Sequence, residues 1–224
     1  MGIATIRRVI QGAQQVEAQT RAMEQSLLRR LPALEQRLLL PEEDPVSALL
    51  EFCNRYVDYV PDFLLQIQQS ASNGSAASAL SPLLHMAEDF FLAPPDALAG
   101  EGGLQALMDE AFLAQRLIEE LDDRYQRSGA GRLVAVDMTR ANIIAMHLIG
   151  EPLASRLEGL VRHSLELVTP PAGSSGFSQP GMMAASIHLP CMSREVGVDL
   201  RFSNADLSGP GRTKRVAQSS EVEG

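Results

Sequence analysis

Apolar side chains recur along most of this chain at alternating steps of three and four residues, the spacing of one buried face of an α-helix. The clearest run comprises Val46, Leu49, Cys53, Tyr56, Val60, Phe63 and Ile67. A second run comprises Leu107, Ala111, Ala114, Ile118, Leu121 and Tyr125. The two runs predict two long amphipathic helices that bury these stripes together.

The N-terminal segment repeats the same spacing with smaller side chains. Its apolar positions are Val9, Ala13, Val16, Thr20, Met23 and Leu27. Ala13 and Thr20 bury little surface, so the stripe is thin although its spacing never breaks. The pattern predicts one helix over residues 3–38, and Pro32 is the residue at which such a helix would bend or restart.

Three further helices are predicted, over residues 81–91, 139–149 and 152–168. Between Ile143 and Ile149 the chain is apolar on nearly every side, which is typical of a helix at the centre of a core. Gly150 ends this helix and Pro152 begins the next one.

Beyond Thr169 the composition changes. Residues 169–182 are rich in Pro, Gly and Ser and indicate a linker, whereas residues 183–203 end in a strict apolar–polar alternation that predicts a β-hairpin. Residues 204–224 are predicted to be a disordered tail. The expected fold is therefore mainly α: a helical bundle of five to six helices over residues 1–168, with a small C-terminal β-hairpin appendage.

Composition narrows the class of protein. Of 224 residues, 45% are hydrophobic but only 4% aromatic, and Trp is absent, which favours a helical core over a β-sandwich. The net charge of −9 argues against nucleic-acid binding, because such binding needs a basic surface. Two cysteines, Cys53 and Cys191, suggest a reduced, cytoplasmic protein, and no apolar stretch reaches the roughly 18 residues of a membrane span.

Charge is distributed unevenly along the chain. Residues 3–38 carry six arginines and three glutamates, a net charge of +3, whereas residues 81–128 carry ten acidic residues and three arginines, a net charge of −7. A basic helix can pack on an acidic surface of its own chain or of a partner. We therefore expect a non-enzymatic helical interaction or regulatory protein that associates with itself or with another protein.

An alternative is a small-ligand or enzyme site within the bundle. Glu110 falls among the leucines of its helix, whereas Asp109, Glu119 and Asp123 are predicted to lie on a solvated face. A buried carboxylate needs a partner or a proton, and His147 is the histidine expected to be buried.

Within this alternative, Glu110 and His147 would form an acid–base pair or share a ligand. Arg140, two turns before His147 on its predicted helix, would contact an anion. The bland interpretation is that Glu110 lies at a helix edge and His147 bonds to backbone.

No metal or other cofactor is expected. His85-x-x-Glu88 and His163-x-x-Glu166 share a spacing that places two ligands on one helix face, but both histidines are predicted to point away from the core. A bundle metal centre requires ligands that project inward.

The tail offers a third, weaker possibility. Residues 206–211 read DLSGPG and follow the strand-like VGVDLRF. This D-x-S-x-x-G pattern resembles one half of the cyclic-di-GMP motif of PilZ domains, although the upstream R-x-x-x-R of that family is missing. The resemblance implies cyclic-dinucleotide binding through the tail.

Overall fold

The computed structural model describes residues 2–72, 77–92, 103–127, 137–168 and 192–201. Its elements are α1 (Gly2–Thr20), α2 (Ala22–Leu34), β1 (Leu38–Leu39), α3 (Pro45–Ser72), α4 (Ala77–Leu92), α5 (Leu104–Arg127), α6 (Thr139–Ile149), α7 (Leu153–Val168), α8 (Met192–Glu195) and β2 (Asp199–Leu200). The fold is mainly α with a small antiparallel sheet, as predicted. None of these helices is long and apolar enough to cross a bilayer.

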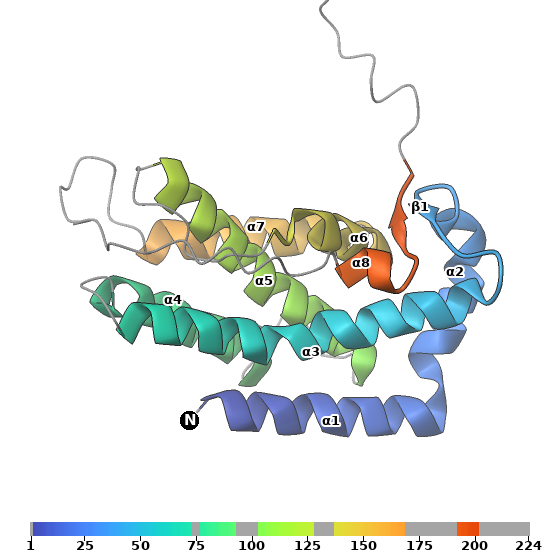
Figure 1. Cartoon of the computed structure of the whole chain (residues 1–224), viewed down its shortest axis with the longest axis horizontal. Helices are drawn as coiled ribbons and strands as arrows, with labels where there is room; N and C mark the ends of the chain where they lie inside the picture. Colours follow the sequence, from blue (N-terminus) through green and yellow to red (C-terminus); the bar gives the residue numbers. More distant parts are fainter. Residues whose placement is uncertain (1, 73–76, 93–102, 128–136, 169–191, 202–224) are drawn as a thin grey trace, which may run out of the picture.

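The long helices are arranged in layers around α5. In Figure 1, α3 and α4 form a middle layer, α1 lies along one side of it, and α6 and α7 lie on the other side. α5 crosses between the layers and contacts α1, α3, α4, α6 and α7. α2 closes one end of the molecule, beside the sheet (Figure 1).

The two clearest runs of the sequence do form the core. From Leu49 to Ile67 every predicted apolar position of α3 is buried, and so are the α5 positions from Leu107 to Leu121. α3 continues through Pro61 as one helix. Cys53 is fully buried, and burial raises the pKa of its thiol to about 12, so it behaves as a small apolar side chain.

The central helix is α5 rather than the predicted 139–149 segment. α6 is buried on one side, but Ile143, Met146 and His147 are each half-buried. α5 instead buries side chains around nearly its whole circumference, including acidic and amide groups. Apolar composition alone did not identify the centre, because α5 also takes polar side chains such as Asp109, Glu110 and Gln115 into the interior.

The C-terminal strand pairs with an N-terminal one. Leu200 of β2 lies opposite Leu38 of β1, in antiparallel register. The predicted alternation holds locally, because Val198 and Leu200 are buried while Gly197 and Arg201 are exposed.

The partner of β2 therefore differs from the hairpin predicted over residues 183–203. Residues 192–195 form the short helix α8. The remainder of that segment before residue 192, the linker 169–182 and the tail 204–224 lie outside the described residues.

The predicted first helix is wrong in two respects. The chain breaks into α1 and α2 at Arg21, and Pro32 lies inside α2 without ending it. The apolar stripe of α1 is also rotated: Ile6 and Ile10 are buried, whereas Val9 and Val16 are 38% and 48% exposed. In α2 the predicted Met23 and Leu27 are buried.

α2 is joined to α6 by one arginine. Arg30 donates to the carbonyl oxygen of His147 at 3.0 Å and also to that of Leu148, so a cation satisfies the C-terminal carbonyls of α6. Gly150 follows with a φ of +83°, and a Cβ there would lie 2.8 Å from Arg30 Nη2. The positive φ is what favours glycine at this position, because the flexible end of the Arg30 side chain could move away from a Cβ.

Candidate functional site

Glu110 is buried on α5, as its position among the leucines predicted. The residue is 6% exposed, and its Oε2 atom has no hydrogen-bond partner among the described residues. Burial, together with the neighbouring charge of Asp109, raises the pKa of Glu110 to about 8. At neutral pH this carboxyl group therefore holds a proton.

The structure does not join Glu110 to the other two predicted site residues. Arg140 forms an ion pair with Asp199 of β2. His147 is half-buried, and burial together with the charge of Arg37 lowers its pKa. No hydrogen bond or ion pair links Glu110, His147 and Arg140 to one another in the part of the chain that the structure describes, so a shared site remains a prediction.

The predicted solvated face of α5 is only partly solvated. Asp123 is exposed, but Asp109 is buried and Glu119 is half-buried. The prediction that this helix face is exposed was wrong, because acidic residues do not always lie on the solvent side of a helix. α5 has neighbours on both of its sides, so its second face is covered as well.

Arg116 makes that second face possible. Its guanidinium donates to Glu158 of α7 at 2.7 Å, to Glu119 at 2.6 Å and to Glu120 at 2.9 Å. Burial disfavours the charged form, but the bonds to Glu158 and the charge of Glu119 outweigh it and raise the pKa of Arg116. One arginine thus ties α5 to α7 and compensates several carboxylates.

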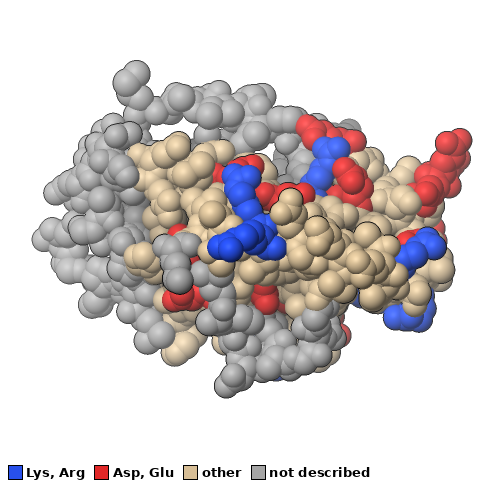
Figure 2. Space-filling view, turned by 90° about the horizontal axis from the view of Figure 1, so that it is seen from below, with Lys and Arg blue, Asp and Glu red and all other residues tan. Residues whose placement is uncertain are grey.

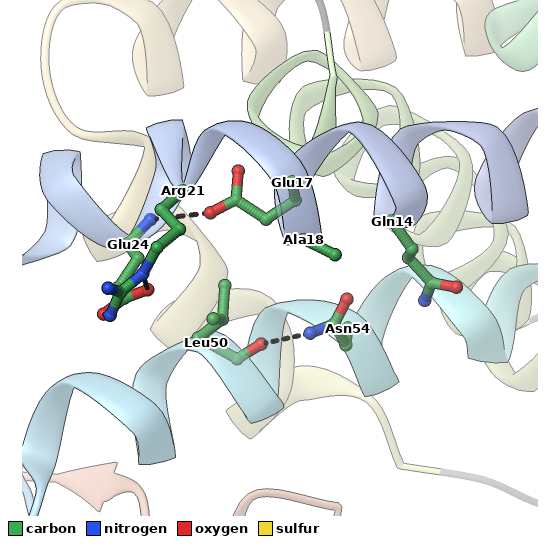
Figure 3. A pocket seen from close by; sticks show the side chains of 7 residues that line it. All are labelled: Gln14, Glu17, Ala18, Arg21, Glu24, Leu50 and Asn54. Atoms are coloured by element: carbon green, nitrogen blue, oxygen red, sulfur yellow. Dashed lines mark hydrogen bonds and ion pairs between the residues drawn. The ribbon is translucent and has the colours of Figure 1, made fainter.

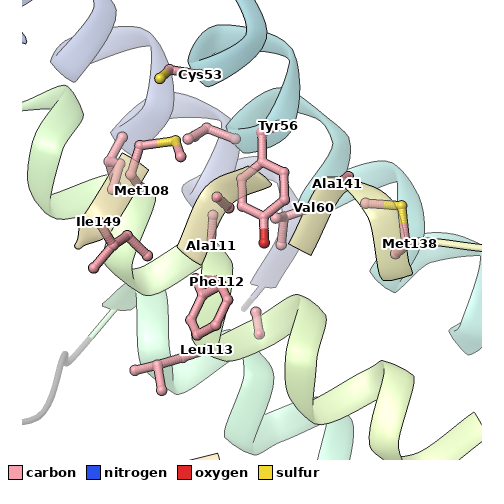
Figure 4. Packing of buried hydrophobic residues seen from close by; sticks show 14 of the residues in the cluster. Cys53, Tyr56, Val60, Met108, Ala111, Phe112, Leu113, Met138, Ala141 and Ile149 are labelled. Carbon is pink, nitrogen blue, oxygen red and sulfur yellow. The ribbon is translucent and has the colours of Figure 1, made fainter. Parts of the chain in front are cut away.

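The same network continues into the core through Asn142 of α6. Asn142 donates to Glu119, and its Oδ1 accepts a 2.7 Å hydrogen bond from the hydroxyl of Tyr56. Gln115 donates to the carbonyl oxygen of Tyr56 at 2.7 Å. Figure 4 shows the Tyr56 ring reaching from α3 toward α5 and α6. Burial raises the pKa of Tyr56 well above its usual value, so it remains a neutral donor.

This polar network holds helices together and is not arranged as a reactive centre. Its hydrogen bonds join α3, α5, α6 and α7 at one level. The network could not be predicted from sequence, because Arg116, Asn142 and Tyr56 belong to three separate segments. The signal that could have indicated it was Asn142, a polar residue next to the apolar run that begins at Ile143.

The break between α1 and α2 is the most unusual backbone feature of the N-terminal region. Arg21 adopts a left-handed conformation with a φ of 52°, which costs a residue other than glycine about 1–2 kcal/mol. The backbone N–H groups of Met23 and Glu24 donate to Glu17 Oε2 and Oε1 at 2.9 and 3.0 Å. Glu17 therefore caps α2 from inside α1, in place of the usual short capping residue.

The elbow is held by burial as well as by this cap. Ile6 and Ile10 of α1 are buried against the body, and burying an isoleucine contributes about 1.5–3 kcal/mol. Arg7 pairs with Asp62 at 2.6 Å, and Gln14 donates to Asp58 at 3.1 Å, so α1 and α3 run antiparallel. Two such isoleucines outweigh the left-handed residue.

A groove of about 310 Å³ lies where α1 turns into α2, against α3. Its lining comprises Gln14, Glu17, Ala18, Arg21, Glu24, Leu50 and Asn54. In Figure 3, Ala18 and Leu50 point into the gap from α1 and α3. Both oxygens of Glu17 are already used by the cap, and Arg21 is paired with Glu24. The groove therefore shows no polar group that requires a ligand.

The histidine pairs give no metal centre in the described residues. His85 is exposed, as predicted, whereas its neighbour Glu88 is buried and accepts a 3.0 Å hydrogen bond from Gln68. His163 and Glu166 are both exposed. No group of three potential ligands comes together among the residues that the structure describes. The PilZ-like residues 206–211 lie outside them.

No family model, curated protein or solved structure shows a significant match to this chain. The functional argument therefore depends on the geometry of the molecule itself.

Proposed function

We propose that this protein is a non-enzymatic helical interaction protein that self-associates, and that α1 makes the contact. One observation supports this most directly: α1 carries two apolar stripes, and the described part of its own chain covers one of them. Ile6 and Ile10 are buried, whereas Val9 and Val16 are exposed on a stripe about 90° away around the helix.

The exposed stripe suits a helix partner. Val9, Gly12 and Val16 follow the three-four spacing of helix packing, and a Cβ at Gly12 would have no atom within 4 Å. In Figure 2 this face shows a basic patch near its centre and a tan stretch without charged side chains between that patch and the right-hand end. A second helix can therefore approach closely along this line.

The stripe is complementary to itself. A two-fold axis between Gly12 and Ala13 would place Val9 of one copy on Val16 of the other and Thr5 on Thr20. Arg8, the charge nearest to the stripe, would lie about 13 Å along the helix from its symmetry mate, beyond the screening distance of about 8 Å in physiological salt. A second copy of the chain thus fits this surface without repulsion.

Such a contact is small. Two valines and a glycine per copy bury far less than the roughly 1,200 Å² of a stable interface, so we expect a weak, concentration-dependent dimer. Sedimentation velocity over a concentration series tests this. Val9→Glu with Val16→Glu should shift the dimer midpoint at least tenfold toward higher concentration.

Leu65→Glu provides the matched control. Leu65 is 37% exposed on α3, almost the same as Val9, but it belongs to no exposed stripe. Equal effects of the control and the α1 variants would mean that general solubility governs the association. A wild-type protein that stays monomeric at the highest concentration would refute self-association.

A second candidate function is a small-ligand site at Glu110. It is favoured by the buried Oε2 atom without a partner. Glu110→Gln keeps the shape and one acceptor oxygen but cannot ionise. If the site binds a ligand, this variant should lose binding in a thermal-shift screen of amines and small cations. A variant that is only more stable, with no compound binding the wild type, would show that Glu110 is a core residue.

A further inference from the structure

We infer that α1 is an exchangeable element, which can leave its own body by straightening at Arg21 and dock on a second copy in the place of that copy's α1. This goes beyond the Val9–Val16 contact and does not require it. It concerns the buried stripe of α1 and the elbow that positions it.

The elbow is a local departure from a continuous helix. The backbone N–H of Arg21 still donates to Glu17 O at 2.8 Å, and that of Gln25 donates to Arg21 O at 3.0 Å. Residues 17–25 contain neither Gly nor Pro. The sequence of this stretch therefore favours a straight helix, and a return of Arg21 to right-handed φ would merge α1 and α2.

Tertiary contacts hold the bent form. In a straight helix the stripe of Ile6 and Ile10 would be rotated by about 100° from that of Met23 and Leu27. One body buries both stripes only because the chain turns between them. A straightened single molecule would expose Ile6 and Ile10 and lose the Arg7–Asp62 pair.

A second copy restores every lost contact. It offers the same surface of α3, α4 and α5, including Asp62 and Asp58, once its own α1 has left. The exchanged dimer therefore keeps the buried area of two monomers and relieves the left-handed residue in each chain. This is the physical condition for domain swapping.

Two substitutions of the elbow residue have opposite effects. Arg21→Gly suits a φ of 52° and disfavours a straight helix, so it should suppress the exchanged dimer. Arg21→Ala cannot relieve the strain in the bent form and favours the straight helix. Because each dimer contains two elbows, we expect the two variants to differ at least about a hundredfold in dimer dissociation constant.

Gln15 provides the control pair. It is exposed in the middle of α1, where Gly and Ala change helix stability equally in the bent and the straight forms. Gln15→Gly and Gln15→Ala should therefore dimerise alike. A Gly–Ala difference at Gln15 as large as that at Arg21 would overturn the hinge assignment.

Spin labels decide which body α1 occupies. Ala4→Cys and Leu65→Cys lie one turn beyond the antiparallel Arg7–Asp62 pair, so both labels give a short distance when α1 is docked. The chain has two native cysteines. Cys191→Ser removes one of them, and the other, Cys53, is buried and should not react with the label. The dimer of Arg21→Ala is prepared at high concentration with excess unlabelled protein.

The two proposals are distinguished by the outcome. If the short distance is lost in dimers formed with excess unlabelled protein, α1 docks on the partner, as inferred. A dimer that keeps it associates side by side, which refutes exchange and leaves the self-association proposal standing. If neither wild type nor Arg21→Ala forms a dimer, both proposals fail.

Discussion

α3 and the α1–α2 segment carry the same apolar spacing in sequence, yet they use it differently. In α3 the residues at this spacing from Leu49 to Ile67 are buried. In α1, Val9 and Val16 are exposed and a neighbouring stripe enters the core instead. α3 has neighbours along its whole length, whereas α1 is an outer helix that packs with one face (Figure 1). A periodic apolar stripe therefore predicts a helix reliably. It predicts which face is buried only where the helix has no second apolar face that could pack against the core instead.

The largest expected effect lies in the central region, at Glu110. Its pKa of about 8 exceeds that of an unfolded glutamate, so the folded state holds a proton that the unfolded state lacks between pH 4.5 and 8. Stability should therefore fall as pH rises through this window. We expect Glu110→Gln to be more stable than wild type by about 4 kcal/mol at pH 8 and nearly equal at pH 4.5. Urea denaturation of both proteins across this range measures the difference.

The same substitution at two predicted seam positions compares the regions directly. Val60 is fully buried in α3, so Val60→Ala should lower the free energy of unfolding by about 2 kcal/mol through lost burial and a residual cavity. Val16→Ala in α1 should stay within about 0.5 kcal/mol of wild type. Equal losses at both positions would mean that α1 is packed differently from the structure described above.

Substitutions in the polar network of Tyr56, Asn142 and Glu119 should have the next largest effect on stability. Asn142→Ala leaves the Tyr56 hydroxyl buried without an acceptor and removes a donor from Glu119, so we expect a loss of about 1.5–2 kcal/mol. Tyr56→Phe should cost about 1 kcal/mol. A double-mutant cycle should show that the second substitution costs much less in the presence of the first. Strict additivity would contradict a direct Tyr56–Asn142 bond.

The smallest effect is expected at the elbow. Glu17→Ala leaves two N–H groups of α2 without their acceptor, and loss of a helix cap costs about 1 kcal/mol. Glu24→Ala removes the exposed Arg21–Glu24 pair and should cost less than about 0.5 kcal/mol, because surface ion pairs contribute little. Thermal denaturation of the two variants side by side checks this order.

For the candidate site, as for the fold, the sequence predicted what happens within one helix but not how two helices meet. Burial of Glu110 followed from its own helix, because its neighbours at three and four residues are apolar. The proposed partnership with His147 did not follow, because it required knowledge of how α5 and α6 cross. In the structure, burial and the charge of Arg37 lower the pKa of His147, and Arg140 pairs with Asp199 of β2, 59 residues further along the chain.

The sequence by itself determined where the long helices α3, α5, α6 and α7 lie, since apolar spacing acts within a few residues, but it did not predict the short helix α8. It also determined that Cys53, Tyr56 and Val60 share a buried face. Tertiary structure alone decided that α5 lies at the centre, that β2 pairs with β1, and that the chain turns at Arg21. These outcomes depend on tertiary contacts: Arg116 bonds to Glu158, Glu17 caps α2, and Ile6 is buried where Val9 is not. Local periodicity contains no information about such meetings, because it describes one helix face and not what covers it.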